Sequence, residues 1–224
     1  QESVVIINSC TRSFVEMHDY YISGGTYSGD SSKVPSDTVK TAADSLKNTL
    51  DVLYDFNPED LAVFNHWIDS TIKETIAAQN RAVIINKSAY TLYVIEKGKV
   101  RSKYFVELGF NPYTDKWVEG DGCTPEGMYK VKVKKDLGQT AFHKAFLINY
   151  PDRQDIREGK TGNLIEIHGT GSGEKGNDTE NGGMNWTSGC AALSDQAMDT
   201  LFQLIHEGDR VTIVRYSESS PGRR

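Results

Sequence analysis

The stretch that decides the fold is Thr187-Ser188-Gly189-Cys190-Ala191-Ala192-Leu193-Ser194-Asp195, near the end of a 224-residue chain. It lies between a loop rich in glycine and asparagine, 169–187, and a helix that we expect over 195–207. Glycine at position 189 permits a tight turn and a close approach of a ligand to backbone N–H groups. A thiol near a helix start has a lowered pKa. The pattern therefore makes Cys190 a candidate nucleophile.

A candidate base precedes this turn. His168 ends the apolar stretch Leu164-Ile165-Glu166-Ile167 and is followed at once by Gly169. A cysteine nucleophile needs a base to form the thiolate and donors for the oxyanion that follows, and a histidine at a strand end beside a flexible loop suits the first need. The same residues also fit a buried apolar cysteine and an ordinary core or surface histidine. The pattern alone leaves both interpretations open.

The chain between residues 81 and 216 has the periodicity of β-strands. We expect strands at 82–85, 91–95, 100–108, 127–134, 145–150, 163–167 and 210–216. Glu96-Lys97-Gly98-Lys99 is typical of a hairpin turn. In 127–134, Tyr129, Val131 and Val133 lie on one side and alternate with Met128 and three lysines on the other, as in a strand. Residues 81–216 are therefore predicted to form a mainly β domain, mostly antiparallel, with one or two helices.

The first 80 residues have a different period. Apolar residues recur at steps of three and four in 37–54 and again in 58–76, and Asn57-Pro58 is a helix-start signal between the two. A small α-helical hairpin is therefore expected in a mainly helical N-terminal region, 1–80. Residues 217–224 are expected to form a disordered tail.

Composition limits the class of protein. Hydrophobic residues make up 38% of the chain, and 31 acidic against 25 basic residues give a formal charge of −6. A mildly acidic chain has no electrostatic footprint for nucleic acid, so no nucleic-acid partner is expected. Cys10, Cys123 and Cys190 allow at most one internal disulfide. They form no CxxC pair, and the histidines form no HExxH motif, so we expect no metal site.

Four segments of the predicted β domain occur in a recognisable order. They are the strands 83–87 and 92–94, Thr124-Pro125-Glu126-Gly127, Ile167-His168-Gly169, and Trp186-Thr187-Ser188-Gly189-Cys190 followed by Leu193-Ser194. In this order they resemble the YkuD-type L,D-transpeptidase catalytic domain, over about three fifths of the chain. The resemblance implies a bacterial enzyme that modifies peptidoglycan, with roles in cell-wall biogenesis and cell shape.

Two positions depart from the family's commonest signature. Ser188 stands where a histidine usually precedes the Gly-Cys pair, and Ala192 stands where a polar residue or arginine often follows. The loop between His168 and Thr187 is also slightly longer than usual. A subset of the family has a motif that resembles W-T-x-G-C, which Trp186 to Cys190 matches. The departures concern substrate contacts and leave the nucleophile and base in place.

The resemblance implies a role for each candidate site residue. Cys190 is the nucleophile, His168 is the base, and the carbonyl of Gly169 orients the imidazole. Backbone N–H groups of Gly189 and Cys190 would stabilise the oxyanion. Ser188 and Trp186 are the candidate substrate-binding residues, with a solvated serine and a bystander tryptophan as the alternatives. No cofactor is implied.

The implied reaction is cysteine-mediated acyl transfer. An L,D-transpeptidase, a transferase, would take the acyl group from a stem tetrapeptide, release D-Ala and form a cross-link to a neighbouring stem. An L,D-carboxypeptidase acting on the same substrate and a catalytically inactive cell-wall-binding module are the alternatives.

The resemblance also implies partners and a location. The partners are peptidoglycan stem peptides, with carbapenem-type β-lactams as covalent inhibitors. The location is extracytoplasmic, in the periplasm or cell wall, for a secreted protein whose signal or anchor segment is not present in this chain. The sequence does not indicate an oligomeric state.

Overall fold

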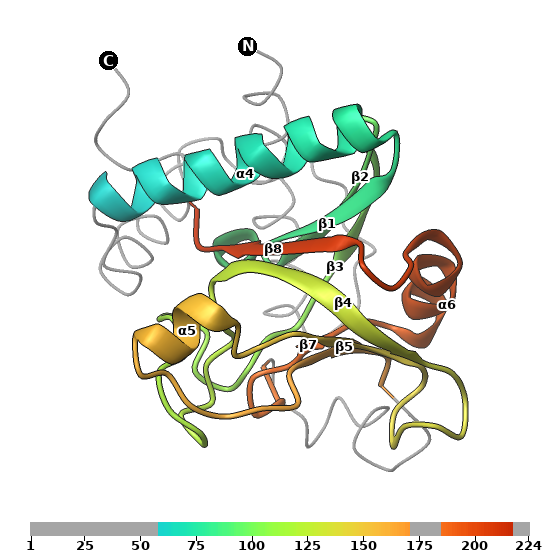
Figure 1. The fold of residues 1–224 in the computed structure, drawn as a ribbon. Coiled ribbons are helices and arrows are strands. Elements are labelled where there is room, and N and C mark those ends of the chain that lie inside the picture. The colour runs from blue at the N-terminus through green and yellow to red at the C-terminus, as the bar shows by residue number, and fades with distance from the viewer. Residues whose placement is uncertain (1–57, 171–184, 217–224) are drawn as a thin grey trace, which may run out of the picture.

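The computed structural model describes residues 58–170 and 185–216, and the labels below are those of Figure 1. Its centre is a curved sheet with the strand order β3-β2-β1-β8-β4-β5-β6-β7. The strands are β1 (Arg81–Asn86), β2 (Thr91–Glu96), β3 (Lys99–Phe105), β4 (Gly127–Lys135), β5 (Ala145–Ile148), β6 (Glu166–His168), β7 (Ala191–Ala192) and β8 (Arg210–Val214). The helices are α4 (Pro58–Ala78), α5 (Arg153–Arg157) and α6 (Asp195–Leu204), with a 3₁₀ turn η2 (Lys87–Ala89).

The mainly β architecture expected for 81–216 is confirmed, with one helix in front of it. The second helix of the expected hairpin is α4. Its first helix, in 37–54, and the tail 217–224 lie outside the described residues. Strand pairing is mostly antiparallel as expected, but β1 lies parallel to β8 and β6 parallel to β7.

Four strand predictions are too long. The strands expected at 145–150 and 210–216 end at Ile148 and Val214. The strand expected at 163–167 begins only at Glu166, because Gly162 (φ 104°) and Leu164 (φ 54°) take left-handed backbone conformations that leave the sheet. The strand expected at 100–108 ends at Phe105. Helix α5 was not predicted; a reciprocal capping box between Asp152 and Asp155 starts it.

Both faces of the sheet centre are covered, which explains the unbroken apolar run of β1. Val83 and Ile85 face the main core, which also contains Met198 and Leu201 of α6. Ile84 faces the other way, into a second cluster with Phe64 and other residues of α4. Figure 1 shows α4 crossing over β1 and β8. A strand buried on both faces has no polar alternation.

Polar contacts join α4 to the sheet. The Arg210 guanidinium of β8 donates from Nε and Nη2 to Glu74 Oε2 at 2.9 and 2.8 Å. At the tip of the predicted β2–β3 hairpin turn, Lys97 and Gly98 have φ of 50° and 82°, and the Gly98 N–H donates to Thr75 Oγ1 at 2.9 Å. Helix α4 is thus tied to the sheet at β8 and at the hairpin.

The two ends of the sheet meet. Just after the edge strand β3, Glu107 pairs with Ala192 of the opposite edge strand β7. The two residues exchange N–H···O bonds, both of 2.8 Å. This pairing satisfies backbone groups that an open edge would leave exposed. It also ties the segment after β3 to the strand that follows Cys190.

A buried ammonium group anchors the long loop 106–126 to the sheet. The side chain of Lys87 is fully buried. Its Nζ donates to the carbonyl oxygens of Thr114 and Thr124 at 2.6 and 2.7 Å. It also donates to Glu126 Oε1 at 2.8 Å. With three acceptors, the buried ammonium group has its hydrogen bonds satisfied. Burial of the Lys87 ammonium without Glu126, or of the Glu126 carboxylate without Lys87, would destabilise the fold strongly.

We therefore predict that Lys87→Met lowers the free energy of unfolding by about 3 kcal/mol or more, because it leaves the Glu126 carboxylate with less compensation in a buried position. Urea denaturation measures the change. Lys99→Met, at an exposed position of β3, is the control and should alter stability little. Equal effects of the two substitutions would contradict the anchoring role.

Candidate active site

His168 is held in one tautomer. It ends β6, is fully buried, and its Nδ1 lies 2.7 Å from the carbonyl oxygen of Gly169. Because a carbonyl only accepts, Nδ1 carries the proton and Nε2 has the free lone pair. Nε2 has no hydrogen-bond partner among the described residues. An imidazole in this state can accept a proton at Nε2.

Gly169 is required at its position by its surroundings. Its N–H donates to the carbonyl of His143 at 3.0 Å. A Cβ at this residue would lie 2.5 Å from that same carbonyl oxygen. The contact between the Gly169 carbonyl and the imidazole, which the family resemblance implies, is present. The close approach of His143 leaves no room for a side chain at position 169.

Two aromatic side chains enclose the imidazole. The ring of Phe142 stacks on His168 with centroids 3.7 Å apart and an angle of 13°. Trp186 meets the imidazole edge to face, with centroids 5.6 Å apart and an angle of 68°. We call Phe142 and Trp186 the aromatic clamp. Burial lowers the pKa of His168, although the Gly169 hydrogen bond acts in the opposite direction, so the residue is neutral at neutral pH.

Strand register places Cys190 on the same face of the sheet as His168. In the parallel pair of β6 and β7, Ile167 lies beside Ala191 and His168 beside Ala192. Ile167 and Ala191 both point into the main core. Since side chains alternate along a strand, Cys190 points to the opposite face, where His168 lies. His168 ends β6 and Cys190 directly precedes β7, so the two predicted residues are diagonal neighbours across this strand pair.

The thiol of Cys190 has its own hydrogen bonds. Its Sγ accepts from the N–H of Glu166 at 3.4 Å and donates to the carbonyl of Leu164 at 3.7 Å. Burial raises the pKa of the thiol to about 11. The expectation that a helix start lowers the pKa of Cys190 is wrong, because β7 separates the cysteine from α6, which begins at Asp195. The resting group is a thiol.

The turn before Cys190 is built around Gly189. This residue has φ 134°, and a Cβ would lie 2.7 Å from the carbonyl oxygen of Cys123. Its N–H donates to Thr187 Oγ1 at 3.2 Å, and that hydroxyl donates to the carbonyl of Cys190 at 2.7 Å. An oxyanion would therefore compete with Thr187 for the N–H of Gly189, one of the two expected donors.

The other candidates are placed as follows. Ser188 is exposed, next to Gly189. Trp186 is half-buried, and its ring contacts the His168 imidazole as described above. Cys123 has a free thiol, with Sγ 3.3 Å from Thr114 Oγ1, while Cys10 lies outside the described residues. Phe142 was not identified from the sequence, because it belongs to no motif and no regular pattern.

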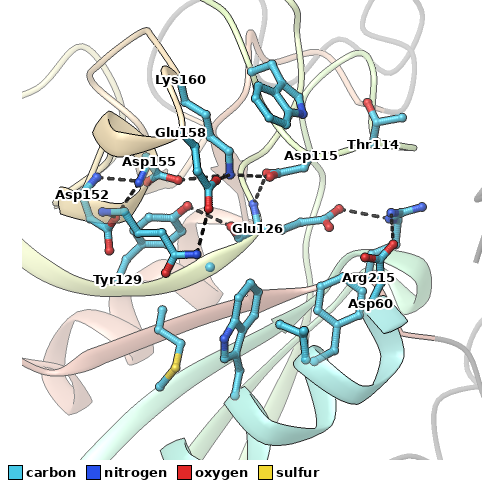
Figure 2. A pocket seen from close by; sticks show the side chains of 17 residues that line it. Asp60, Thr114, Asp115, Glu126, Tyr129, Asp152, Asp155, Glu158, Lys160 and Arg215 are labelled. Carbon is cyan, nitrogen blue, oxygen red and sulfur yellow. Dashed lines mark hydrogen bonds and ion pairs between the residues drawn. The ribbon is translucent and has the colours of Figure 1, made fainter. Parts of the chain in front are cut away.

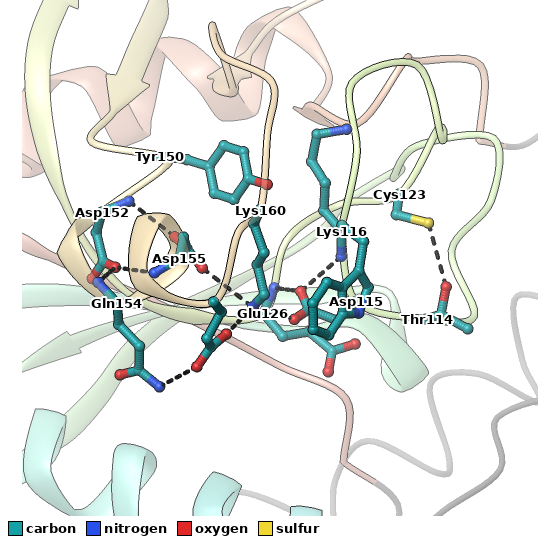
Figure 3. A network of polar contacts seen from close by, with 12 residues as sticks. Thr114, Asp115, Lys116, Cys123, Glu126, Tyr150, Asp152, Gln154, Asp155 and Lys160 are labelled. Carbon is teal, nitrogen blue, oxygen red and sulfur yellow. Dashed lines mark hydrogen bonds and ion pairs between the residues drawn. The ribbon is translucent and has the colours of Figure 1, made fainter.

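A cavity of about 470 Å³ lies away from these residues, between α4, the start of β4 and α5 (Figure 2). Neither Cys190 nor His168 lines it. Its charged groups bind one another: Lys160 Nζ lies 2.7, 3.2 and 3.0 Å from oxygens of Asp115, Asp155 and Glu158. Figure 3 shows this network between α5 and the loop that carries Cys123. The cavity is therefore a separate feature whose lining acids are already paired.

Within 58–170 and 185–216, no group of three or more histidine, cysteine or carboxylate side chains is arranged to hold a metal ion. In the same residues, no helix is both long and apolar enough to cross a bilayer.

The fold and the site define a class of protein. A family model described as "L,D-transpeptidase catalytic domain", YkuD, matches residues 80–213. The match covers more than half of the chain, and the chain belongs to this family. A comparison with curated protein sequences gave no match.

Solved structures agree in fold. The helical cell shape determining protein Pgp2 from Campylobacter jejuni is 26% identical, with a TM-score of 0.51 over 67% of this chain and 56% of that chain. Its K307A mutant is 28% identical, with a TM-score of 0.50 over 62% and 49% of the two chains. Bd1075 from Bdellovibrio bacteriovorus is 22% identical, with a TM-score of 0.47 over 62% and 49%. This chain thus spans little more than half the length of the Pgp2 structure.

The geometry of the turn gives a prediction for Gly189→Ala. We expect it to destabilise the protein by about 1–3 kcal/mol more than Gly208→Ala does. Both glycines have positive φ, 134° and 90°, but only the Cβ at 189 would meet another atom. Thermal unfolding of the two variants measures the difference. Similar melting temperatures would show that the approach of Cys123 to Gly189 does not constrain the turn.

Proposed function

We propose that this protein is a peptidoglycan L,D-transpeptidase, with Cys190 as the nucleophile and His168 as the general base. One observation carries the proposal: the Gly169 carbonyl holds the proton on Nδ1, so that Nε2 is unprotonated and has no partner among the described residues. The register of β6 and β7, extended by one residue to Cys190, supports a position of the thiol on the same face. A merely structural histidine would be expected to use both ring nitrogens.

The first half-reaction is acylation. As Sγ attacks the carbonyl carbon of a diaminopimelate or equivalent residue in a stem tetrapeptide, His168 Nε2 takes the thiol proton. The C–S bond forms, the amide C–N bond breaks, and D-Ala leaves as its amine receives the proton from the imidazolium. Because the thiol pKa is raised and the imidazole pKa lowered, proton transfer accompanies the attack rather than preceding it.

The second half-reaction decides the product. An amine of a neighbouring stem peptide attacks the thioester, the C–N bond of the cross-link forms, and Cys190 leaves as the thiolate and regains a proton. If water attacks instead, the enzyme is an L,D-carboxypeptidase on the same substrate. Both reactions use the same two residues, so the acceptor alone separates them. A binding module that had lost catalysis would need neither.

Further contacts belong to the same proposal. The backbone N–H groups of Cys190 and Gly189 are the proposed oxyanion donors, with Gly189 released from Thr187 as the oxyanion forms. Exposed Ser188 is a proposed substrate contact, and Trp186 contributes through the part of its ring that is not buried. The similarity to a cell shape determining protein supports a role in cell-wall biogenesis. We propose an extracytoplasmic location, peptidoglycan stem peptides as partners and carbapenems as covalent inhibitors.

Acylation by a carbapenem tests the nucleophile and base. Intact-protein mass spectrometry should show one adduct on Cys190 in the wild-type protein and none in Cys190→Ala. His168→Ala should slow adduct formation by about two to four orders of magnitude, the usual contribution of a general base. Cys123→Ala is the matched control and should be acylated at the wild-type rate.

The possible outcomes separate the three candidate functions. A folded, reduced wild-type protein that forms no adduct would favour the inactive binding module. With an adduct present, muropeptide products after incubation with stem tetrapeptides identify the acceptor. Cross-linked dimers support the transpeptidase, whereas tripeptides alone support the carboxypeptidase.

The acid limb of the acylation rate should lie below pH 6.5. The active base is neutral His168, and burial lowers the pKa of this residue below its ordinary value of about 6.5. The neutral form therefore persists to a lower pH than in an exposed histidine, and the rate falls only as pH drops through the lowered pKa. A rate profile between pH 4.5 and 8 measures the midpoint. An acid midpoint above 6.5 would contradict the assignment of a buried neutral base.

A further inference from the structure

A bulge in β4 sets the direction in which the end of this strand points. Val131 lies beside Ile148 of β5, but Val133 lies beside Leu147, so β4 has one extra residue between the two pairs. Val131 and Ile148 face the main core. Simple alternation from Val131 would therefore also point Lys135 into the core. The extra residue reverses the alternation, and the lysine leaves the sheet on the opposite face.

That face is the one that carries the proposed base. Lys135 pairs with Ala145 of β5, and Ala145 pairs with His168 of β6. Residues directly opposite one another on neighbouring strands point to the same face, so the side chains of Lys135 and His168 share a face. Bulges are common beside active sites, where they re-aim a side chain.

A carboxylate on β6 holds the ammonium group of Lys135. Its Nζ lies 2.5 Å from Glu166 Oε1, so the lysine side chain reaches past β5 to the next strand. The Glu166 side chain is 7% exposed and the Lys135 side chain 26%. No other described residue bonds to this Nζ, and an ammonium group has several N–H donors. Donors of Lys135 therefore remain open to a further anion.

Glu166 places this ammonium group beside the thiol. The N–H of Glu166 donates to Cys190 Sγ at 3.4 Å. The register of Ile167 with Ala191, extended by one residue, pairs Glu166 with Cys190. Lys135 Nζ is thus held over β6, the strand adjacent to the nucleophile, on the face to which the thiol points.

The proposed substrate has an anion at a matching distance from the reacting carbonyl. The bond that breaks joins this carbonyl to D-Ala, so only the amide nitrogen and the Cα of D-Ala separate it from the terminal carboxylate. One residue of extended chain spans about 3.5 Å, less than the spacing of about 4.8 Å between neighbouring strands. A substrate that acylates Cys190 therefore brings its terminal carboxylate within range of a cation over β6.

We propose that Lys135 binds the terminal carboxylate of the stem tetrapeptide, and that Glu166 orients Lys135 for this role. Lys135 is then a specificity-determining residue, which selects a chain end with a free carboxylate over an internal D-Ala residue. One ammonium group can serve several carboxylates, as Lys160 does elsewhere in this chain. The inference deepens the proposed function and rests on it for the identity of the ligand.

Binding of two peptides tests the inference without turnover. Calorimetry on the 224-residue chain with Cys190→Ala measures the affinity for a synthetic stem tetrapeptide and for the same peptide with a C-terminal carboxamide. The free acid should bind about tenfold or more tightly than the amide, the usual contribution of a hydrogen bond between charged groups. Adding Lys135→Met should remove this preference, so that the two peptides bind equally.

Two further variants separate recognition from general destabilisation. Lys130→Met, at an exposed position of the same strand, is the matched control and should keep the preference for the acid. Lys135→Met leaves the Glu166 carboxylate without its partner. The double variant Lys135→Met/Glu166→Gln removes both charges, and it covers the case in which the single variant does not fold. It too should bind the acid and the amide equally.

The outcomes separate the inference from the proposed function. A preference for the acid that survives Lys135→Met, or equal binding of acid and amide to the Cys190→Ala chain, would overturn the inference, as would the absence of binding by either peptide. A wild-type protein that forms no carbapenem adduct, with the preference for the acid intact and dependent on Lys135, would be a failure of the proposed function alone. An acylated wild-type protein whose binding ignores the carboxylate would be a failure of the inference alone.

Discussion

The ammonium group of Lys87 is the contact on which the geometry of the site depends. Lys87 follows β1 directly, and its three acceptors belong to the loop 106–126. One consequence concerns Cys123, the residue before Thr124. The carbonyl oxygen of Cys123 lies so close to Gly189 that only glycine fits at position 189. Another is at Gly109, whose N–H donates to Thr124 Oγ1 at 2.9 Å. The Lys87 ammonium group at the end of β1 therefore fixes the loop 106–126, and this loop in turn contacts the turn before Cys190.

Much of this architecture follows from local sequence. The Lys97-Gly98 turn, the alternation of β4 as far as Val131 and the helical period of α4 are local patterns, and each is present. The alternation of β4 fails after Val131, where the pairing with β5 shifts register and leaves Val133 exposed. A bulge of this kind depends on the partner strand, so no property of residues 127–134 alone predicts it. His168 and Cys190 were predictable because each stands at the junction of a strand and a glycine.

The remaining features depend on distant parts of the chain. Phe142 stacks on His168 from the loop between β4 and β5, and Glu107 pairs with Ala192 only because the two edges of the sheet meet. The protonation state of Cys190 is also a tertiary property. Proximity to a helix in the sequence favours a lowered thiol pKa. Here the two residues of β7 separate Cys190 from the helix, and burial raises the pKa of the thiol instead. The sequence indicates the proposed reacting groups, His168 and Cys190, but not the residues that distant segments bring against them.

Burial acts on both reacting groups in the same sense. It raises the pKa of the Cys190 thiol and lowers that of the His168 imidazole, so each change favours the neutral form. A thiolate–imidazolium pair is therefore unfavourable at rest, and the charges must be stabilised as they form. The Gly169 carbonyl stabilises the imidazolium through Nδ1, while the Glu166 N–H already points at Sγ. Thiols are oxidised mainly through their thiolate form. Burial keeps Cys190 protonated at rest, so it makes the cysteine both a weaker nucleophile and less easily oxidised.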